Sequence, residues 1–173
     1  MKRSIEPYVF NNIRLRLITE NDLPLTLAWR NLENNRKWFK NSHLISSEEH
    51  FSWYKAYTEK DDDFVFIVET SGIPNRSVGQ ASIYKIDWKN RTAEIGRFVV
   101  SPKWAGRGLM KKASQAIVLL AFSVFGLKSL HLEVFDKNAR AKHIYEECGF
   151  KTIQHDSLSG TLTMKCLREN IAF

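Results

Sequence analysis

Apolar and polar residues alternate near the start of the chain. The segment from Ile13 to Thr19 follows this alternation, which predicts a strand with one buried face. Asp22 or Thr19 can then cap a helix that runs to about Leu32. The residues expected on the inner face of this helix are Leu23, Leu27 and either Trp29 or Arg30.

A second helix and three strands are expected next. Ser46 and Glu49 have the spacing of a capping box, and the helix they open carries Trp53, Tyr54 and Tyr57. Runs rich in β-branched and aromatic residues follow at 64–69, 78–86 and 91–100, with turns at 71–77 and 87–90. This pattern predicts an antiparallel meander.

The apolar spacing becomes helical again after residue 108. One face of this third helix would hold Leu109, Ala113, Ala116, Ile117, Leu120 and Val124, with Gly126 in the C′ position. A strand at 130–135, a helix from Asn138 to Gly149, and a hairpin of 150–154 with 161–167 complete the chain. The elements together predict a mixed α/β fold in which helices cover a mixed sheet.

Composition fits one ordinary globular domain spanning residues 1–173, with 43% hydrophobic and 26% charged residues. The N-terminal residues lack the apolar core of a signal peptide, and the longest apolar run, 116–122, is too short to cross a bilayer. We therefore expect a cytoplasmic protein that does not act at a membrane. Cys148 and Cys166 are far apart and lack paired spacing, so we expect neither a metal site nor a disulfide.

The formal net charge of +7 suggests a polyanionic partner. A nucleic acid, a membrane surface and a phosphorylated small molecule all fit that description. The basic residues are scattered and form no long block, which argues against nucleic acid. A phosphorylated small molecule is the remaining expectation.

A glycine-containing loop at 103–108 separates the strand 91–100 from the helix that follows. Glycines let a main chain approach a ligand closely, and a helix N-terminus favours negative charge, so the loop can hold a pyrophosphate. Lys103, Arg107, Lys111 and Lys112 would reinforce it. A Gly-x-Gly sequence is equally compatible with a simple helix-entry turn, and it matches neither the dinucleotide fingerprint nor the P-loop.

Two motifs in order resemble the GNAT acetyltransferase superfamily. Lys103-x-x-Gly106-x-Gly108 after a Phe-Val-Val strand is similar to that family's Gln/Arg-x-x-Gly-x-Gly/Ala loop, with Lys103 as a departure. The segment from Leu130 to Phe150 resembles the family's strand, Asn138, helix, Tyr145 and Gly-Phe ending. The resemblance implies a mostly antiparallel sheet of six to seven strands with helices on both faces.

The same resemblance implies acetyl-coenzyme A as co-substrate, held in the gap of a splayed strand pair. The residues it places around this cofactor are Phe98, Val99, Val100, Lys103, Ala105, Gly106, Arg107, Gly108, Leu109, Met110, Asn138, Lys142 and Tyr145. The Val100 N–H would meet the thioester oxygen, and Tyr145 matches the family's general acid. For the base, Glu94 is preferred over Glu133, with Ser82 as a relay, although strand-end salt bridges would explain both carboxylates equally well.

Aromatic and basic residues are dense in the first third of the chain. Buried aromatics could simply be core, but Arg30, Arg36 and His50 are costly to bury unpaired. The region resembles N-acetyltransferases of a UDP-linked 4-amino sugar in pseudaminic acid biosynthesis. The residues this assigns to the acceptor are Trp29, Arg30, Asn31, Arg36, Trp38, His50, Trp53 and Tyr84.

Other acceptors stay open at this point. A protein N-terminus, an antibiotic or another small amine is an alternative, and a polyamine would call for an acidic pocket. A non-catalytic module that binds coenzyme A or nucleic acid is the alternative outside enzymes. The sequence leaves open whether the protein is a monomer or a homodimer.

Overall fold

The computed structural model describes residues 2–70 and 76–171 and contains one eight-stranded sheet with the order β1-β2-β3-β4-β5-β6-β8-β7. The strands are β1 Tyr8–Phe10, β2 Ile13–Leu17, β3 Phe64–Thr70, β4 Arg76–Asp87, β5 Thr92–Val100, β6 Ser129–Phe135, β7 Lys151–Asp156 and β8 Thr161–Leu167. All neighbouring strands are antiparallel except β5 and β6. The predicted mixed, mostly antiparallel sheet is confirmed.

The expected strand count of six to seven was too low because β1 was missed. This strand is only three residues long and pairs with β2 through a tight turn. Asn11 and Asn12 both have positive φ, at 45° and 58°, which matches a type I′ hairpin turn. Residues 71–75 of the predicted turn at 71–77 lie outside the described residues.

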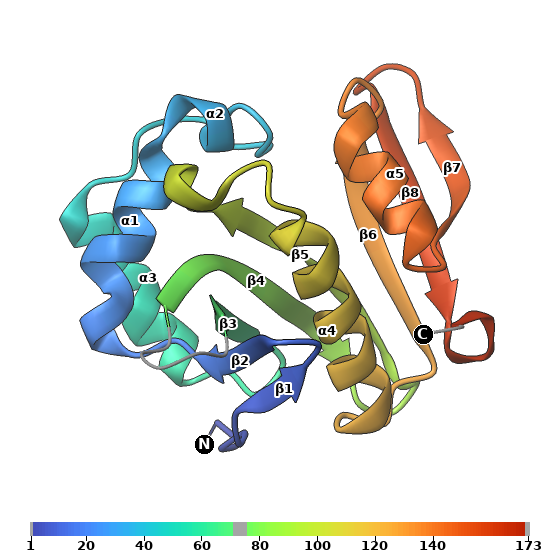
Figure 1. The fold of residues 1–173 in the computed structure, drawn as a ribbon, viewed down its shortest axis with the longest axis horizontal. Coiled ribbons are helices and arrows are strands. Elements are labelled where there is room, and N and C mark those ends of the chain that lie inside the picture. Colours follow the sequence, from blue (N-terminus) through green and yellow to red (C-terminus); the bar gives the residue numbers. More distant parts are fainter. Residues whose placement is uncertain (1, 71–75, 172–173) are drawn as a thin grey trace.

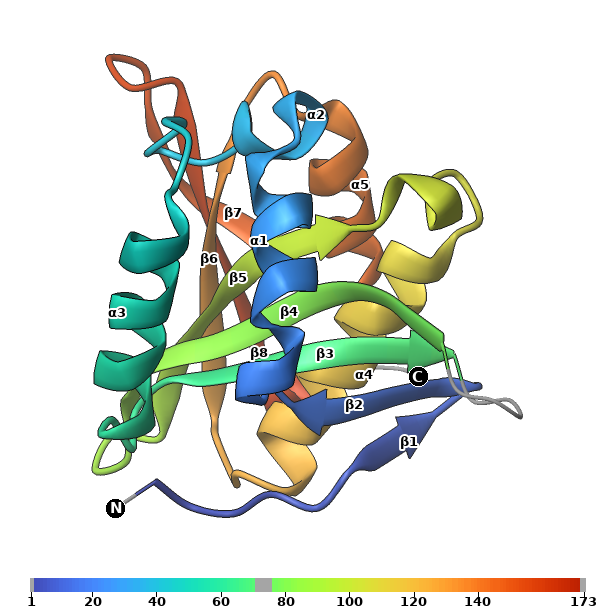
Figure 2. The ribbon, with the colours of Figure 1, turned by 90° about the vertical axis from the view of Figure 1, so that its left-hand side faces the viewer.

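Helices cover both faces of the sheet. They are α1 Leu23–Asn31, α2 Glu33–Arg36, α3 Ser47–Thr58, α4 Leu109–Ser123 and α5 Ala139–Glu147. α1 and α3 lie on one face, and α4 and α5 lie on the other (Figures 1 and 2). The short α2 was not predicted, because four polar residues carry no apolar period.

The predicted helix starts agree with the structure. The Ser46 side chain accepts a hydrogen bond from the Glu49 N–H (3.1 Å), and the Glu49 carboxylate accepts from the Ser46 N–H (2.7 Å). Asn138 caps α5 by accepting from the Ala141 N–H (3.2 Å). These bonds satisfy amide groups that have no partner within the helix.

The predicted inner faces are partly right. Leu23 and Trp29 of α1 are buried, whereas Leu27 and Arg30 are half-buried. Val124 was wrongly placed on the buried face of α4, since it is 52% exposed. The reason is that the helix ends at Ser123, and Gly126, with φ of 67°, follows after Val124 and Phe125 instead of occupying C′.

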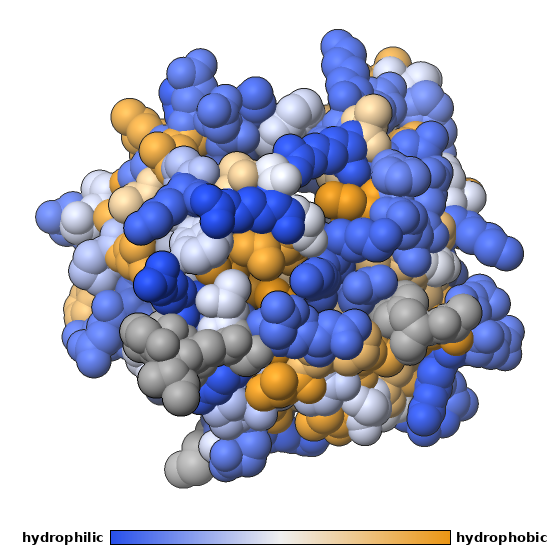
Figure 3. Space-filling model, viewed as in Figure 1, coloured by the Kyte–Doolittle hydropathy of each residue, from blue (hydrophilic) through white to orange (hydrophobic). Residues whose placement is uncertain are grey.

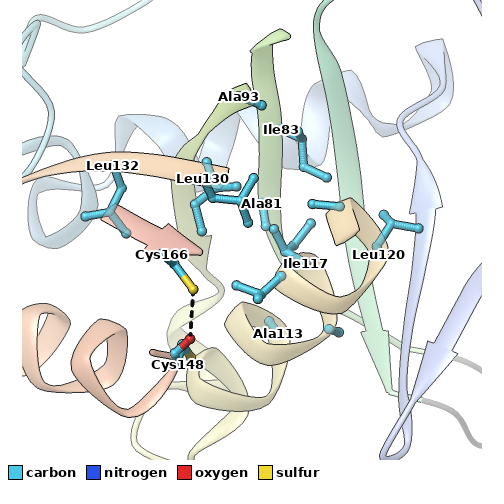
Figure 4. Close-up of a cluster of buried hydrophobic side chains, with 14 of the residues drawn as sticks. Ala81, Ile83, Ala93, Ala113, Ile117, Leu120, Leu130, Leu132, Cys148 and Cys166 are labelled. Atoms are coloured by element: carbon cyan, nitrogen blue, oxygen red, sulfur yellow. Dashed lines mark hydrogen bonds between the residues drawn. The ribbon is translucent and has the colours of Figure 1, made fainter. Parts of the chain in front are cut away.

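The main core lies between α4 and the sheet. Ala113, Ala116, Ile117 and Leu120 project from α4 onto apolar side chains of β4 and β6, such as Ile83 and Leu130 (Figure 4). The alanines let the helix approach the sheet closely. Dense packing of this kind fixes where the N-terminus of α4 lies.

Both cysteines are free and buried at the far end of this core. The Sγ of Cys166 lies 3.7 Å from the carbonyl oxygen of Cys148 (Figure 4). Burial raises the pKa of the Cys148 thiol to about 12 and that of Cys166 to about 11. Both groups are therefore neutral core residues, as the sequence predicts for Cys148.

The sheet forks between β5 and β6. The two strands pair in parallel only from Thr92–Ser129 to Glu94–His131, after which β5 continues to Val100 and β6 to Phe135 along separate paths. Figure 1 shows β6, α5, β7 and β8 diverging from the rest of the sheet. The predicted splayed pair is present.

A β-bulge lies in β5 after the point where its pairing with β6 ends. Ser82 of β4 pairs with Gly96, and Gln80 pairs with Val99, so that Arg97 and Phe98 both lie opposite one residue. Arg97 has φ of 52°, in the left-handed region that costs a side-chain-bearing residue roughly 1–2 kcal/mol. The bulge bends β5 and re-aims its side chains at the fork.

Close packing of β4 on β5 gives a test of this register. A Cβ built on Gly79 would lie 2.3 Å from the Val99 carbonyl oxygen. Because the obstacle is backbone, we expect Gly79→Ala to lower the free energy of unfolding by about 1–3 kcal/mol, measured by urea denaturation. Ser77→Ala on the same strand is the control, and an equal, small effect of both substitutions would contradict the register.

Candidate functional site

A cleft of about 990 Å³ occupies the fork. The end of β5, the glycine loop, α2 and the segment 38–41 line it on one side of the fork, and β6 and α5 line it on the other (Figure 1). Figure 3 shows hydrophobic side chains at the bottom of a hollow that hydrophilic side chains surround. The fork is thus the one place where both halves of the sheet and the loop meet.

The glycine loop enters α4 through two left-handed residues. Gly106 has φ of 79°, and Gly108, the N-cap of α4, has φ of 71°. A Cβ at either position would meet nothing within 4 Å, so packing does not explain the glycines, and the backbone conformation does. The loop presents a helix N-terminus beside open space, which suits an anion.

Only part of the predicted loop set lines the cleft. Ala105, Gly106 and Met110 do, whereas Lys103, Arg107, Gly108 and Leu109 lie outside its lining. The Arg107 guanidinium lies over the Trp104 ring at 5.0 Å. Lys142 lies on the outer side of α5 near Glu146 (3.8 Å) and also does not line the cleft.

The register at the end of β5 fixes the direction of its main-chain groups. Val100 pairs with Gly79, and the Ser101 N–H donates to the Val78 carbonyl (2.9 Å). Because bonded and non-bonded pairs alternate in antiparallel strands, Val100 turns its N–H and C=O away from β4 and toward the gap. The Val100 carbonyl accepts a bond from Asn35 Nδ2 (3.2 Å).

Val99 and Phe98 have opposite environments. The Val99 side chain is buried at 2% exposure, and its main chain faces β4, so the structure does not place this predicted cofactor residue in the cleft. Phe98 lines the cleft and packs on Tyr145, with ring centroids 5.7 Å apart. The alternation along one strand explains the difference.

Tyr145 lies on α5 and is held between two aromatic rings from outside that helix. Its ring packs on Phe98 and on Phe150, whose centroid is 6.2 Å away. Burial raises the pKa of the Tyr145 phenol well above its usual range, so the group is protonated at neutral pH. A protonated phenol at the cleft wall can donate a proton. Asn138 also lines the cleft while its Oδ1 caps α5.

The two candidate carboxylates occupy different positions. Glu133 lines the cleft and forms an ion pair with Lys40 (2.5 Å) from the opposite wall. Glu94 lies at the closed end of the fork, outside the cleft lining, and pairs with Lys85 (2.7 Å). Glu94, the preferred candidate for the base, is therefore less well placed for this role than Glu133. Ser82 is fully buried and does not line the cleft, and its Oγ has no hydrogen-bond partner within the described ranges.

Tyr84 forms part of the cleft next to Glu94. Burial, and then the negative charge of Glu94, raise the pKa of Tyr84 to about 12. Gly96 makes room for this phenol, because a Cβ there would lie 2.9 Å from the Tyr84 oxygen. The Arg97 guanidinium covers the other face of the ring at 4.2 Å.

A second cavity of about 320 Å³ adjoins the cleft. Arg30, Phe39 and Arg97 line both cavities and so form their common wall. His50 and Trp53 line the second cavity with their rings stacked at 5.2 Å. Burial lowers the pKa of His50, which keeps the imidazole neutral at neutral pH, and its Nε2 lies 3.0 Å from Thr26 Oγ1.

The structure divides the predicted acceptor residues. Arg30, Trp38 and Tyr84 line the cleft, and Arg30, His50 and Trp53 line the second cavity. Three others line neither, because they have structural contacts instead. Trp29 is a core residue at 5% exposure, Asn31 bonds both main-chain groups of Ile45 (2.8 and 2.9 Å), and Arg36 donates to the Ser42 carbonyl (2.9 Å).

Sequence reasoning assigned only Arg30 of the common wall to the site and missed Phe39 and Arg97. Its guanidinium binds both carboxylate oxygens of Asp63 (2.8 and 3.0 Å), and Asp63 is only 5% exposed. An arginine inside a strand is typical of a solvent-facing position, and only the bulge turns it into the site. The sequence carries no clear signal for that bulge.

Within residues 2–70 and 76–171, no group of three or more His, Cys, Asp or Glu side chains could hold a metal ion. No helix of that part of the chain has the length and apolarity to span a membrane.

Comparison with known proteins gives consistent matches. A family model described as an acetyltransferase (GNAT) domain matches residues 12–151. A protein of Methanocaldococcus jannaschii is 30% identical over 144 residues, which cover 82% of this chain but only 28% of that protein. The spermidine N(1)-acetyltransferase of Vibrio cholerae is 26% identical over 144 residues, covering 81% of this chain and 79% of the relative.

A solved structure shares the fold. The spermidine N-acetyltransferase of Vibrio cholerae in complex with CoA and spermine is similar with a TM-score of 0.83 and 22% identity. The similarity covers 93% of this chain and 98% of that chain.

The Arg97–Asp63 ion pair gives a test of the common wall. Asp63→Asn leaves the half-buried guanidinium without its counter-charge, so we expect the free energy of unfolding to fall by about 1–3 kcal/mol in urea denaturation. Asp62→Asn, next to it in the chain, is the control. A fall of the same size in both variants would show that the pair does not hold Arg97.

Proposed function

The chain belongs to the GNAT acetyltransferase family and is an N-acetyltransferase that uses acetyl-coenzyme A, and on this premise we propose that its acceptor is the primary amine of a small molecule. The proposed reaction is direct attack of the amine on the thioester within a ternary complex. Atoms balance simply: the acetyl carbon gains a bond to nitrogen, the carbon–sulfur bond breaks, and the amine proton leaves.

The observation that carries the proposal is the single cleft across the fork. The glycine loop, the end of β5, Tyr145, α2 and Arg30 all line this cleft, and the register of β5 turns the Val100 N–H toward the gap. A donor held by the loop and β5 and an acceptor held near Arg30 would meet near the end of β5. Holding two reactants in this way accounts for a large share of the catalytic effect of such enzymes.

The donor side accounts for the thioester. In the proposed complex, the pyrophosphate lies at the N-terminus of α4, and the extended arm lies along the unpaired edge of β5. The Val100 N–H then meets the thioester oxygen, where negative charge develops during attack. The bond from Asn35 to the Val100 carbonyl holds the next peptide group, between Val100 and Ser101, in place.

Tyr145 fits the role of general acid. The departing thiolate needs a proton, and a phenol with a raised pKa keeps its proton at neutral pH for this step. Its position between Phe98 and Phe150 leaves the ring little freedom. An acid fixed in this way has the correct protonation state and the correct direction.

We propose Glu133 as the group that accepts the amine proton, directly or through water. Of the two candidates Glu94 and Glu133, it is the one that lines the cleft, and its partner Lys40 is 67% exposed, so the ion pair between them costs little to open. Glu94 stays as the alternative because Tyr84, which does line the cleft, lies beside it across β4 and β5.

The comparisons change the expected acceptor. The named relatives include spermidine N(1)-acetyltransferases, and none of the matches supports a nucleotide-linked amino sugar. The alternative of another small amine therefore replaces the amino sugar as our proposal. A polyamine is the second candidate, because these relatives act on one.

Release of the coenzyme A thiol tests the proposal directly. The protein should release thiol from acetyl-coenzyme A only when a suitable amine is present, with mass spectrometry showing the acetylated amine. The panel would hold polyamines, amino acids, amino sugars and their phosphates, and ribosomal-protein peptides. A protein that binds coenzyme A by calorimetry yet acetylates no member would count against a small-amine acceptor.

The acid role of Tyr145 makes a kinetic prediction. Tyr145→Phe keeps the ring packing and removes the proton donor, so we expect kcat to fall roughly 10²- to 10⁴-fold. The dissociation constant for acetyl-coenzyme A should stay the same in calorimetry. Tyr8→Phe, which lies on β1 away from the cleft, is the control, and an unchanged kcat in the Tyr145 variant would remove the acid role.

The base is tested with a pair of variants. Glu133→Gln cannot accept a proton, so we expect kcat/KM to fall about 10²-fold or more. Glu94→Gln makes the same substitution at the other candidate carboxylate and should change kcat/KM little. If Glu94→Gln, and not Glu133→Gln, causes the large fall, the role belongs to Glu94.

A further inference from the structure

Arg30 is the unmatched cation of the wall between the two cavities. It lies in the last turn of α1 and lines both the cleft and the second cavity. One nitrogen donates to the Asn41 carbonyl, and the guanidinium plane lies over the Phe39 ring at 4.0 Å. Its Nη1 is buried and has no hydrogen-bond partner within the described parts of the chain.

Two neighbouring cations of the site have ion-pair partners. Arg97 pairs with Asp63, and Lys40 pairs with Glu133, but no carboxylate lies within ion-pair distance of Arg30 in residues 2–70 and 76–171. Burial and the positive charge of Arg36 both disfavour its charged form and lower its pKa. Arginine nevertheless stays protonated in proteins, so an uncompensated cation is kept facing two cavities.

We infer that Arg30 binds an anionic group of the acceptor, so that the substrate is an amine that also carries a carboxylate or a phosphate. This inference rests on the proposed function and names the substrate class for the same site. A planar guanidinium fits both oxygens of either anion, and stacking on Phe39 holds its plane fixed. Arg30 lines both cavities, so an anion held there can meet the guanidinium.

The two adjoining cavities suggest how such an acceptor would be oriented when bound. Its amine would lie in the cleft, near the end of β5, and its anionic group at the common wall. The remainder would extend into the second cavity over the stacked rings of His50 and Trp53. His50 is neutral there, so Arg30 carries the charge recognition and the rings provide a flat apolar surface.

The same charges disfavour a polyamine. A second ammonium group at the common wall would face Arg30 and Arg97 at close range, which is repulsive. Three acidic residues line the two cavities. In the cleft, Glu133 pairs with Lys40 and Glu33 is the other carboxylate, whereas Glu49 at the second cavity already accepts from the Ser46 N–H (2.7 Å) and lies 3.6 Å from His43. None of the three lies close enough to Arg30 to form an ion pair.

Two matched pairs of amines test the inference. The first compares 5-aminopentanoate with 1,5-diaminopentane, which differ only in the charged group at the far end. The second compares glucosamine 6-phosphate with glucosamine, and so distinguishes phosphate from carboxylate. For at least one pair we expect kcat/KM to favour the anionic member by about ten- to hundredfold.

Substitution of Arg30 should remove that preference. Arg30→Met retains an apolar stem of similar length, so the anionic amine should lose about ten- to hundredfold in kcat/KM while its uncharged or cationic partner changes little. Binding of acetyl-coenzyme A should be unchanged in calorimetry. Lys37→Met removes one positive charge from the same region outside both cavities, and it should leave the preference intact.

A binding measurement keeps the test independent of turnover. With coenzyme A at saturation, inorganic phosphate should raise the melting temperature of the wild type and of Lys37→Met, but not that of Arg30→Met. If phosphate stabilises all three alike, or if wild type prefers the cationic amines, the inference is overturned. If no amine is acetylated while stabilisation by phosphate still depends on Arg30, the small-amine proposal fails and the anion site stands.

Discussion

The interruption of hydrogen bonding between β5 and β6 is the constraint on which the site depends. Parallel pairing ends at Glu94 and His131, and beyond that point each strand has main-chain groups on its inner edge that need another partner. The bulge at Arg97 lies beyond this point in β5, and the register with β4 turns the main-chain groups of Val100 toward the gap. A ligand that lies between the strands can supply the missing hydrogen bonds, so the architecture of the sheet itself creates the binding site.

The charged groups around the cleft are distributed according to what the strands allow. Arg97 can leave the regular strand direction because of the bulge, and the nearly buried Asp63 at the start of β3 fixes its guanidinium. Lys40 reaches Glu133 from the opposite half of the molecule. Arg30 differs from both because it is supported by an aromatic ring and a carbonyl instead of a carboxylate. The wall therefore has a net positive character that fold similarity to other acetyltransferases does not determine.

Local patterns in the sequence predict most of the elements, because alternation, helical spacing and capping are local effects. The Ser46–Glu49 box, the Asn138 cap and the glycine loop are all found where the residues place them. β1 and α2 were missed because three or four residues carry too little periodicity. Site residues are harder, since Trp29, Asn31 and Arg36 differ from Arg30 only in which way one helix and its loop turn them. The bulge that brings Arg97 into the wall depends on pairing between distant segments, which local patterns do not reveal.

The buried cysteine of α5 bears on the kinetic order of the reaction. Cys148 follows Tyr145 by less than one helical turn, and a thiol there could in principle take the acetyl group and form an acyl-enzyme. Its side chain is fully buried, and burial raises its pKa to about 12, so almost no thiolate exists at neutral pH. The packing thus makes Cys148 a poor nucleophile for the acetyl group and favours direct transfer to the amine.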